Sequence, residues 1–440
     1  MKFLKSNINS FLISFLLISS TIMLQNPLVP YFSGILGKIQ IFDIIFPIII
    51  MIFLKNIYLN SINKFNTIIF ILISIFIFIS VITFNLSIKH FIFFYLFLIL
   101  LMTSNIKLST LDLKKILNSL ILFIFIILIC SLLFFTYSYF SSEDTIFTQV
   151  RSGFPYIDNV VRITGPFKPT AKFLSFYLLC IWPFVIIWFY YFNNKTNHLI
   201  ILSSLCIVVS LFTMGRSGLF TAFLYFSTII FFTKKNEKFY KLFFLYFTFL
   251  IIFLIIFINT ILHVDLNISQ CASKVIDKAT SQYFGWVYFD NSKCNILKVN
   301  IFDNTYFILK KIAFNMWLSN PFTGNGLGSF YEHYLTLSEK NELSQNLKLT
   351  HFYYPQSQYL LLLAENGILG FIIWFLIIIL CFHKIMLKFN IFKSHIGVLF
   401  LLCFSSSLID LDIQNFRFFY LLIGFGLMFT HKNFALDKKS

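Results

Sequence analysis

Residues 65–85 read FNTIIFILISIFIFISVITFN, a stretch of 21 residues without a charged side chain. A helix of about 20 apolar residues spans the roughly 30 Å hydrocarbon core of a bilayer and satisfies its own backbone hydrogen bonds there. Similar runs recur along the chain, in which 58% of 440 residues are hydrophobic, 12% are charged and the mean hydropathy is +0.85. This composition excludes a water-soluble globular protein and predicts a polytopic membrane protein.

The apolar runs predict about twelve transmembrane helices. Their approximate ranges are 9–29, 39–54, 65–85, 89–104, 115–137, 173–192, 199–214, 217–233, 241–262, 366–382, 395–410 and 415–430. Between them lie a polar segment and a large loop, which we expect to carry short helices of its own. We therefore predict an all-α polytopic membrane protein in four parts: N-terminal helices (1–137), helices with basic outer-face motifs (138–262), the large loop (263–356) and C-terminal helices (357–440).

The lysines predict the orientation, because short loops rich in Lys and Arg stay in the cytoplasm. If the spans alternate, most short-loop lysines fall on one side, and Lys38 and Lys89 are exceptions. Both termini are then cytoplasmic, while the large loop and the turns at 215–217 and 410–412 lie on the outer side. The first apolar stretch follows two lysines as in a signal peptide, but no A-x-A-like site follows it, so we expect an uncleaved first helix.

The net charge of +17 would suggest nucleic-acid binding in a soluble protein. Lysines that face anionic membrane lipids account for most of this charge here, so we expect no nucleic-acid partner. Cys271 and Cys294 lie in the large outer loop, and the sequence leaves open whether they form a disulfide. We find no metal-ligand spacing, Walker loop or dinucleotide fingerprint, and expect neither metal nor cofactor. The remaining cysteines lie in predicted spans as small apolar fillers: Cys130, Cys180, Cys206, Cys381 and Cys403.

Only four of the 34 cationic side chains are arginines, and all four fall on the predicted outer side: Arg151, Arg162, Arg216 and Arg417. That side of a membrane is normally poor in positive charge. The planar guanidinium binds a phosphate through two parallel hydrogen bonds and never loses its charge. The pattern indicates an anionic ligand at the outer face, although Arg151 and Arg417 fit equally well as surface or interfacial residues.

Two basic motifs stand out on this side. Residues 162–169, RITGPFKP, combine Arg162 and Lys168 with a Gly-Pro turn just before the sixth predicted span. Residues 213–218, TMGRSG, place Arg216 between two apolar helices, where a charge costs a few kcal/mol unless it is paired or faces a wet cavity. The glycines allow a backbone or a ligand to approach closely, and the serine is placed to begin a helix with its positive dipole end. We interpret both motifs as anion-binding; contact with lipid headgroups is the alternative.

Two further motifs lie near the end of the large loop. Residues 319–330, SNPFTGNGLGSF, have glycines at alternate positions, which predicts a bare, sharply turned backbone that admits a substrate, or else a plain flexible turn. Residues 351–360, HFYYPQSQYL, lead through 364–370, AENGILG, into the tenth predicted span. Polar side chains are costly to leave unpaired there, so we expect something hydrophilic to meet them.

Four elements occur in order: R-x-x-G-x-F before a middle span, T-x-x-R-x-G between two spans, P-x-x-G-x-G-x-G-x-F in the outer loop, and Q-Y-L followed by A-E-N-G-I-L-G. Together they resemble the O-antigen ligase and O-antigen polymerase superfamily of bacterial membrane glycosyltransferases, roughly over residues 162–370. The resemblance implies a GT-C-like fold and a metal-independent glycosyltransferase of lipopolysaccharide biosynthesis. It implies a donor glycan on polyprenyl (undecaprenyl) diphosphate, an acceptor that is lipid A core or a lipid-linked glycan, and a periplasmic site on the bacterial inner membrane.

The resemblance and the residue pattern assign candidate roles. Arg162 and Arg216, with Lys168 assisting, would stabilise the charge that develops on a diphosphate leaving group. The family tends to place an arginine upstream of the Asn-Pro, whereas Tyr306 stands near that position here. Lys310 and the lysine that follows it are the possible cationic substitutes.

A second departure concerns the general base. Family members commonly carry His-Asn where this chain has Gln356 and Ser357, and glutamine cannot accept a proton. Gln356 is then a candidate substrate-binding residue. His351 and Glu365 are the candidates to accept the proton of the acceptor hydroxyl, and Glu365 fits equally well as a group that caps or orients the following helix.

The leading hypothesis is transfer of a glycan from polyprenyl diphosphate to lipid A core, as in O-antigen ligases. Polymerisation onto a lipid-linked repeat unit is the alternative within this enzyme class. A lipid-linked glycan flippase or transporter is the alternative from another class, and it would need polar residues in mid-membrane, where Asp43 is the obvious candidate. We expect Arg162→Lys and Arg216→Lys each to remove most activity without lowering the folded yield, and Arg417→Lys to be mild.

Overall fold

The computed structural model describes residues 10–15, 17, 41–53, 64–83, 88–106, 109–152, 159–166, 171–193, 195–213, 215–233, 305–339, 355, 357–388, 395–409, 411 and 417–430. This part of the chain is mostly helical. The predicted span 241–262 and most of 9–29 lie outside the described residues, as do Cys271 and Cys294.

The described helices coincide with ten of the predicted spans and with parts of the large loop. Three are long and apolar enough to cross a membrane, namely α5, α6 with its π-helical extension η3 (Lys172–Asn193), and α14. The total of twelve spans stays a prediction. The bounds are α2 (Ile41–Phe53), α3 (Lys64–Thr83), α4 (Ile88–Ser104), α5 (Thr110–Ser141), α6 (Ala171–Trp188), η3 (Phe189–Asn193), α7 (Thr196–Phe212), α8 (Arg216–Thr233), α11 (Thr305–Ser319), α12 (Ser329–Glu339), α14 (Gln358–Lys388), α15 (His395–Ser407) and α16 (Arg417–Met428).

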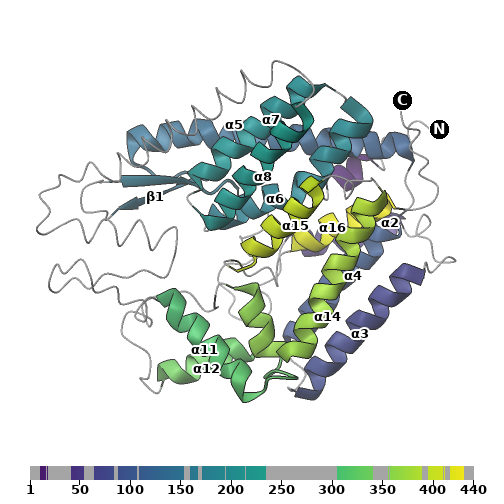
Figure 1. Ribbon diagram of the computed structural model, residues 1–440, viewed down its shortest axis with the longest axis vertical. Helices are drawn as coiled ribbons and strands as arrows, with labels where there is room; N and C mark the ends of the chain where they lie inside the picture. Colours follow the sequence, from purple (N-terminus) through teal and green to yellow (C-terminus); the bar gives the residue numbers. More distant parts are fainter. Residues whose placement is uncertain are drawn as a thin grey trace, which may run out of the picture.

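The α6 helix forms the centre of the bundle. In the most apolar 18 residues of each membrane-length helix, 83% are buried in α6, against 33% in α5 and 39% in α14. Protein therefore encloses α6, whereas α5 and α14 are more exposed. Figure 1 shows α5, α7 and α8 in one group and α3, α4 and α14 in another, with α15 and α16 between them. Aromatic rings fill the contacts; for example, Trp182 of α6 stacks on Phe400 of α15 with ring centroids 5.2 Å apart.

Side chains at both ends of α5 fix its boundaries. Ser109 and Asp112 form a capping box, in which the Ser109 side chain accepts from the Asp112 amide and the Asp112 carboxylate accepts from the Ser109 amide. At the other end Ser142 adopts a left-handed conformation with φ of 58°, which ends the helix. The chain then turns back across the end of α5.

The segment 138–172 contains a two-stranded antiparallel sheet, so the all-α prediction was wrong here. Strand β1 (Thr148–Ser152) pairs with β2 (Asn159–Ile163), with Gln149 opposite Arg162. The hydroxyls of Ser138 on α5 and Thr148 on β1 lie 2.5 Å apart and attach the hairpin to the helix. Neither TQVRS nor NVVRI alternates regularly between apolar and polar residues, so the sequence pattern did not indicate strands here.

A buried ion pair joins α2 to α16. The Nε and Nη2 atoms of Arg417 donate to the two carboxylate oxygens of Asp43 at 2.6 and 2.8 Å, and both side chains are largely buried. Arg417 is therefore neither a surface residue nor a candidate for an external anion. Asp43 likewise has a protein partner, which removes the one residue that we considered for a transport pathway.

Loss of one partner of this pair should destabilise the bundle. Asp43→Asn leaves the buried guanidinium without its counter-charge, for which we expect a loss of about 3–5 kcal/mol and a lower unfolding temperature in detergent. Arg417→Lys keeps the charge and should cost less. Glu143→Gln is the control, because Glu143 is exposed and its carboxylate accepts a hydrogen bond from the exposed Tyr137 side chain. Equal unfolding temperatures for Asp43→Asn and the wild type would contradict the assignment.

Candidate functional site

The turn between α7 and α8 carries the second basic motif. Thr213 caps the C-terminus of α7, and Arg216 is the first residue of α8. A Cβ added to Gly218 would lie 2.5 Å from the Thr213 hydroxyl oxygen and would also collide with the Ser210 carbonyl. Gly218 therefore serves the close approach of the two helices, which places Arg216 in a tight hairpin.

Arg162 of β2 binds this turn, which brings the two basic motifs together. Its Nε and Nη2 atoms donate to the Thr213 carbonyl oxygen at 3.3 and 3.1 Å. Carbonyls at a helix C-terminus have no intrahelical partner and carry partial negative charge, so a buried cation is favourable there. With 6% of its surface exposed, Arg162 has a structural role that the sequence did not predict.

Helices α6 and α8 run parallel and begin at the same level. The Ser175 and Ser217 hydroxyls lie 2.7 Å apart, and one turn later the Thr221 hydroxyl donates to the Ser175 carbonyl at 2.9 Å. Deeper in the bundle Tyr225 bonds the Leu178 carbonyl at 2.9 Å. The contacting residue numbers increase in the same direction along both helices, so the two helix axes are parallel. The two N-termini therefore lie side by side.

Lys172, in the first turn of α6, lies beside the same turn. Its Cγ atom is 3.7 Å from where a Cβ on Gly215 would lie. The sequence prediction overlooked Lys172, although a lysine at the outer end of a predicted span was a usable signal. Three cationic residues thus lie near the two helix N-termini: Arg162, Lys172 and, by its backbone, Arg216. This arrangement favours an anion, because each N-terminus exposes amide groups and partial positive charge.

The glycine-rich loop docks on a break in α14. Gly367 has φ of 62° and ψ of −171°, which interrupts the helix. The amides of Asn325 and Gly326 donate to the Ala364 and Glu365 carbonyls at 3.0 and 2.7 Å. In the opposite direction, the amides that follow Gly367 donate to loop carbonyls: Ile368 to Pro321 at 2.9 Å and Leu369 to Phe322 at 3.2 Å.

The loop glycines are needed for this contact. Gly324 has φ of +72°, and a Cβ there would lie 2.5 Å from the Asn366 amide nitrogen and equally close to the Glu365 carbonyl carbon. The Asn325 side chain strengthens the junction by donating to the Met316 and Ala364 carbonyls at 2.7 and 3.0 Å. The bare backbone therefore meets α14, and the interpretation that it also admits a substrate stays a prediction.

Several polar groups of α14 near its start also form hydrogen bonds within the protein. The Ser357 carbonyl and hydroxyl accept from the amides of the first turn, so Ser357 caps the helix. The Tyr359 hydroxyl donates to the Ser405 carbonyl at 2.8 Å, and the Gln358 amide donates to the Leu408 carbonyl at 3.0 Å. Asn366 bonds Ser80 of α3 through its amide nitrogen.

The remaining candidates divide between described and undescribed residues. Glu365 is fully buried on α14, beside the break. Lys310 lies on α11, which packs against α14, at the opposite end of the view from α7 (Figure 1). Outside the description lie His351, Gln356, Lys168 and the side chains of Arg151, Arg216 and Tyr306.

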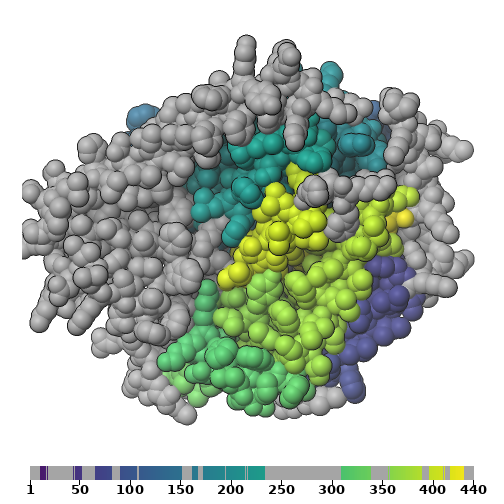
Figure 2. Space-filling model, viewed as in Figure 1, coloured from purple at the N-terminus to yellow at the C-terminus, as the bar shows by residue number. Residues whose placement is uncertain are grey.

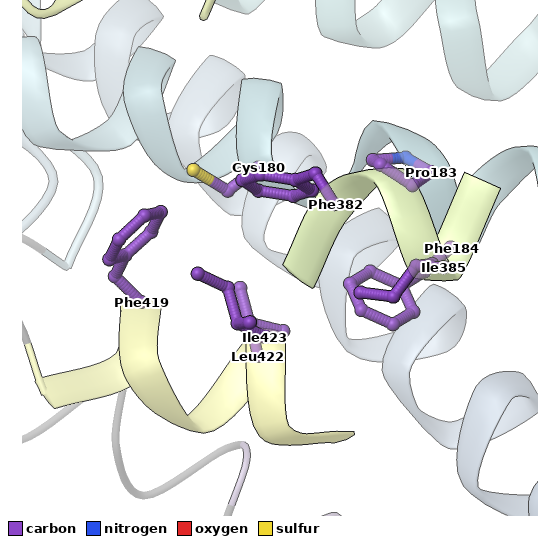
Figure 3. A pocket seen from close by; sticks show the side chains of 8 residues that line it. All are labelled: Cys180, Pro183, Phe184, Phe382, Ile385, Phe419, Leu422 and Ile423. Atoms are coloured by element: carbon purple, nitrogen blue, oxygen red, sulfur yellow. The ribbon is translucent and has the colours of Figure 1, made fainter. Parts of the chain in front are cut away.

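An apolar gap lies among α6, α14 and α16, and Figure 3 shows the side chains around it. The gap is too narrow to admit a water molecule. It is therefore a packing defect at the Pro183 position of α6 rather than a substrate cavity. Its lining residues are Cys180, Pro183, Phe184, Phe382, Ile385, Phe419, Leu422 and Ile423.

Comparison with known proteins identifies one family. The family model described as O-antigen ligase matches residues 198–375. The match includes α7, α8, α11, α12 and the break in α14, and it confirms the resemblance seen in the motifs. No curated protein matches the chain.

The loop–helix junction yields a stability prediction. Gly324→Ala forces a side chain into a positive-φ position and against the α14 backbone, so we expect a loss of at least about 1–3 kcal/mol and a lower unfolding temperature. Gly215→Ala is the matched control, because its Cβ would meet only ordinary contacts of 3.6 Å or more. The junction would lose its proposed importance if both variants unfolded at the wild-type temperature.

Proposed function

We propose that this chain, which matches the O-antigen ligase family model over residues 198–375, transfers a glycan from polyprenyl diphosphate to lipid A core at the periplasmic face of the inner membrane. The observation that carries this proposal is the pair of parallel N-termini, of α6 and α8, with cationic residues around them. An extended lipid-linked repeat unit as acceptor would instead make the protein a polymerase.

The proposed chemistry is a displacement at the anomeric carbon of the donor. The acceptor hydroxyl oxygen forms the new glycosidic bond while the bond to the diphosphate breaks, and the polyprenyl diphosphate leaves with the electron pair. Fixed cations and helix N-termini stabilise that developing charge without reorganising during the reaction. In our proposal Arg216 and Lys172 stabilise the charge on the leaving diphosphate, and Lys168 assists them. Arg162 holds the turn on which they depend, and no metal ion is required.

The acceptor hydroxyl must also lose a proton. We assign this step to His351, because histidine is the side chain that most often acts as a general base. The full burial of Glu365 beside the α14 break supports its alternative role of orienting that helix. Gln356 and Lys310 stay proposed substrate contacts.

The two arginines of the motifs should respond differently to substitution by lysine. Arg216→Lys replaces a planar fork by a point charge, so we expect transfer to slow roughly 10²–10³-fold at an unchanged folded yield. Arg162→Lys should lose activity and also lower the unfolding temperature, because Arg162 holds the Thr213 carbonyl. Full activity of Arg216→Lys in reconstituted vesicles would remove Arg216 from the mechanism.

Product analysis tests the function itself. The purified, reconstituted protein receives a polyprenyl-diphosphate-linked glycan with or without lipid A core, each in the presence and absence of EDTA. Glycan-capped lipid A core that also forms in EDTA is the expected result. Longer lipid-linked chains without that acceptor would establish a polymerase, and movement of the donor across the vesicle membrane without transfer would establish a transporter.

A further inference from the structure

The outward side of α11 exposes apolar side chains next to a cation. Phe314 and Leu318, one helical turn apart, are 43% and 56% exposed, and Lys311 is exposed one turn earlier on the same side. The opposite side of the helix, which includes Ala313 and Met316, packs into a small core with α12 and the first turns of α14. An apolar stripe flanked by lysine is typical of a helix that lies in a membrane interface.

Phe322 follows α11 in the chain and lies beside the membrane-spanning part of α14. It is 68% exposed, and its carbonyl accepts from the amide of Leu369, so the two residues are adjacent. Figure 2 shows the green surface of α11 and α12 next to the lime surface of α14. From Leu369 onward α14 exposes a row of apolar side chains along one side: Leu369, Ile372, Leu376 and Ile379.

The length of α14 limits the height of this junction. After the break at Gly367, the apolar part of the helix runs from 368 to 382, before His383 and Lys384. At 1.5 Å per residue these 15 residues span about 22 Å, which is less than the roughly 30 Å hydrocarbon core. The break therefore lies no farther out than the outer boundary of the hydrocarbon, with Phe322 and α11 next to it.

We propose that α11 is an interfacial helix whose outward face, formed by Phe314, Leu318 and Phe322, inserts into the headgroup and acyl-chain boundary of the bilayer. The occupant of this face is membrane lipid, because the face continues the exposed apolar row of a membrane span. Lys311 lies where its ammonium group reaches lipid phosphates. The lipid thereby holds the junction between the glycine-rich loop and α14 at a fixed depth. This inference is independent of the proposed transferase reaction.

Depth-dependent quenching tests the proposal in the full-length protein. A fluorescent amino acid replaces Leu318 in one variant and Glu332 of α12 in a control variant, and both proteins are reconstituted into vesicles. Brominated acyl chains report contact with lipid, and iodide added to the water reports exposure to solvent. The probe at 318 should lose emission with brominated lipid and little with iodide, whereas the exposed position 332 should show the reverse.

Two other outcomes would overturn the proposal. Strong quenching by iodide at 318 would place the face in water. Protection of 318 from both quenchers would mean that protein, such as a second copy of the chain, covers it. The Phe322→Ser variant adds a check that does not alter α11. Quenching by brominated lipid at 318 should weaken when the residue between α11 and the lipid-facing row of α14 becomes polar.

Discussion

The hydrogen bonds between the glycine-rich loop and the break in α14 are the constraint on which the outer part of the structure depends. A helix that breaks near the hydrocarbon must find new partners for its freed amides and carbonyls, because lipid offers none. The loop backbone supplies them from both sides of Gly367, donating through Asn325 and Gly326 and accepting through Pro321 and Phe322. Each side chain larger than hydrogen at Gly324 or Gly367 would separate the two backbones. The contact therefore ties α11 and α12 to a membrane-spanning helix.

A second constraint acts at the α6–α8 pair, where positive charge is concentrated. Two adjacent helix N-termini contribute roughly half a positive charge each. Neighbouring helices resist this repulsion through the Ser175–Ser217 contact and the Thr221 bond to α6. A diphosphate would relieve it, since a pair of opposite unit charges 4 Å apart is worth about 4 kcal/mol near a protein surface. Under the proposed function, the arrangement would destabilise the fold slightly and be stabilised by a bound anion.

The sequence was sufficient for the membrane class and for the helices, because a lipid environment demands long apolar runs that are visible in one chain. It also located both basic motifs and the loop, through residue types that are costly at a membrane surface. It failed where the partner is distant in sequence. Nothing near Arg417 indicates Asp43, and nothing in the glycine run indicates that it packs against Ala364. The β1–β2 hairpin was missed because its strands do not alternate regularly between apolar and polar residues.

Placement on the predicted outer side of the membrane indicates which arginines need a partner, but it does not say whether that partner is protein or ligand. Arg417 has a carboxylate, in Asp43, which neutralises it within the fold. Arg162 donates to a neutral carbonyl, at Thr213, and thereby holds the turn between α7 and α8. Arg216 begins a helix whose dipole adds to its own charge rather than opposing it. Predicted placement on the outer side therefore does not by itself separate an arginine that completes the fold, such as Arg417, from one proposed to bind an anion, such as Arg216.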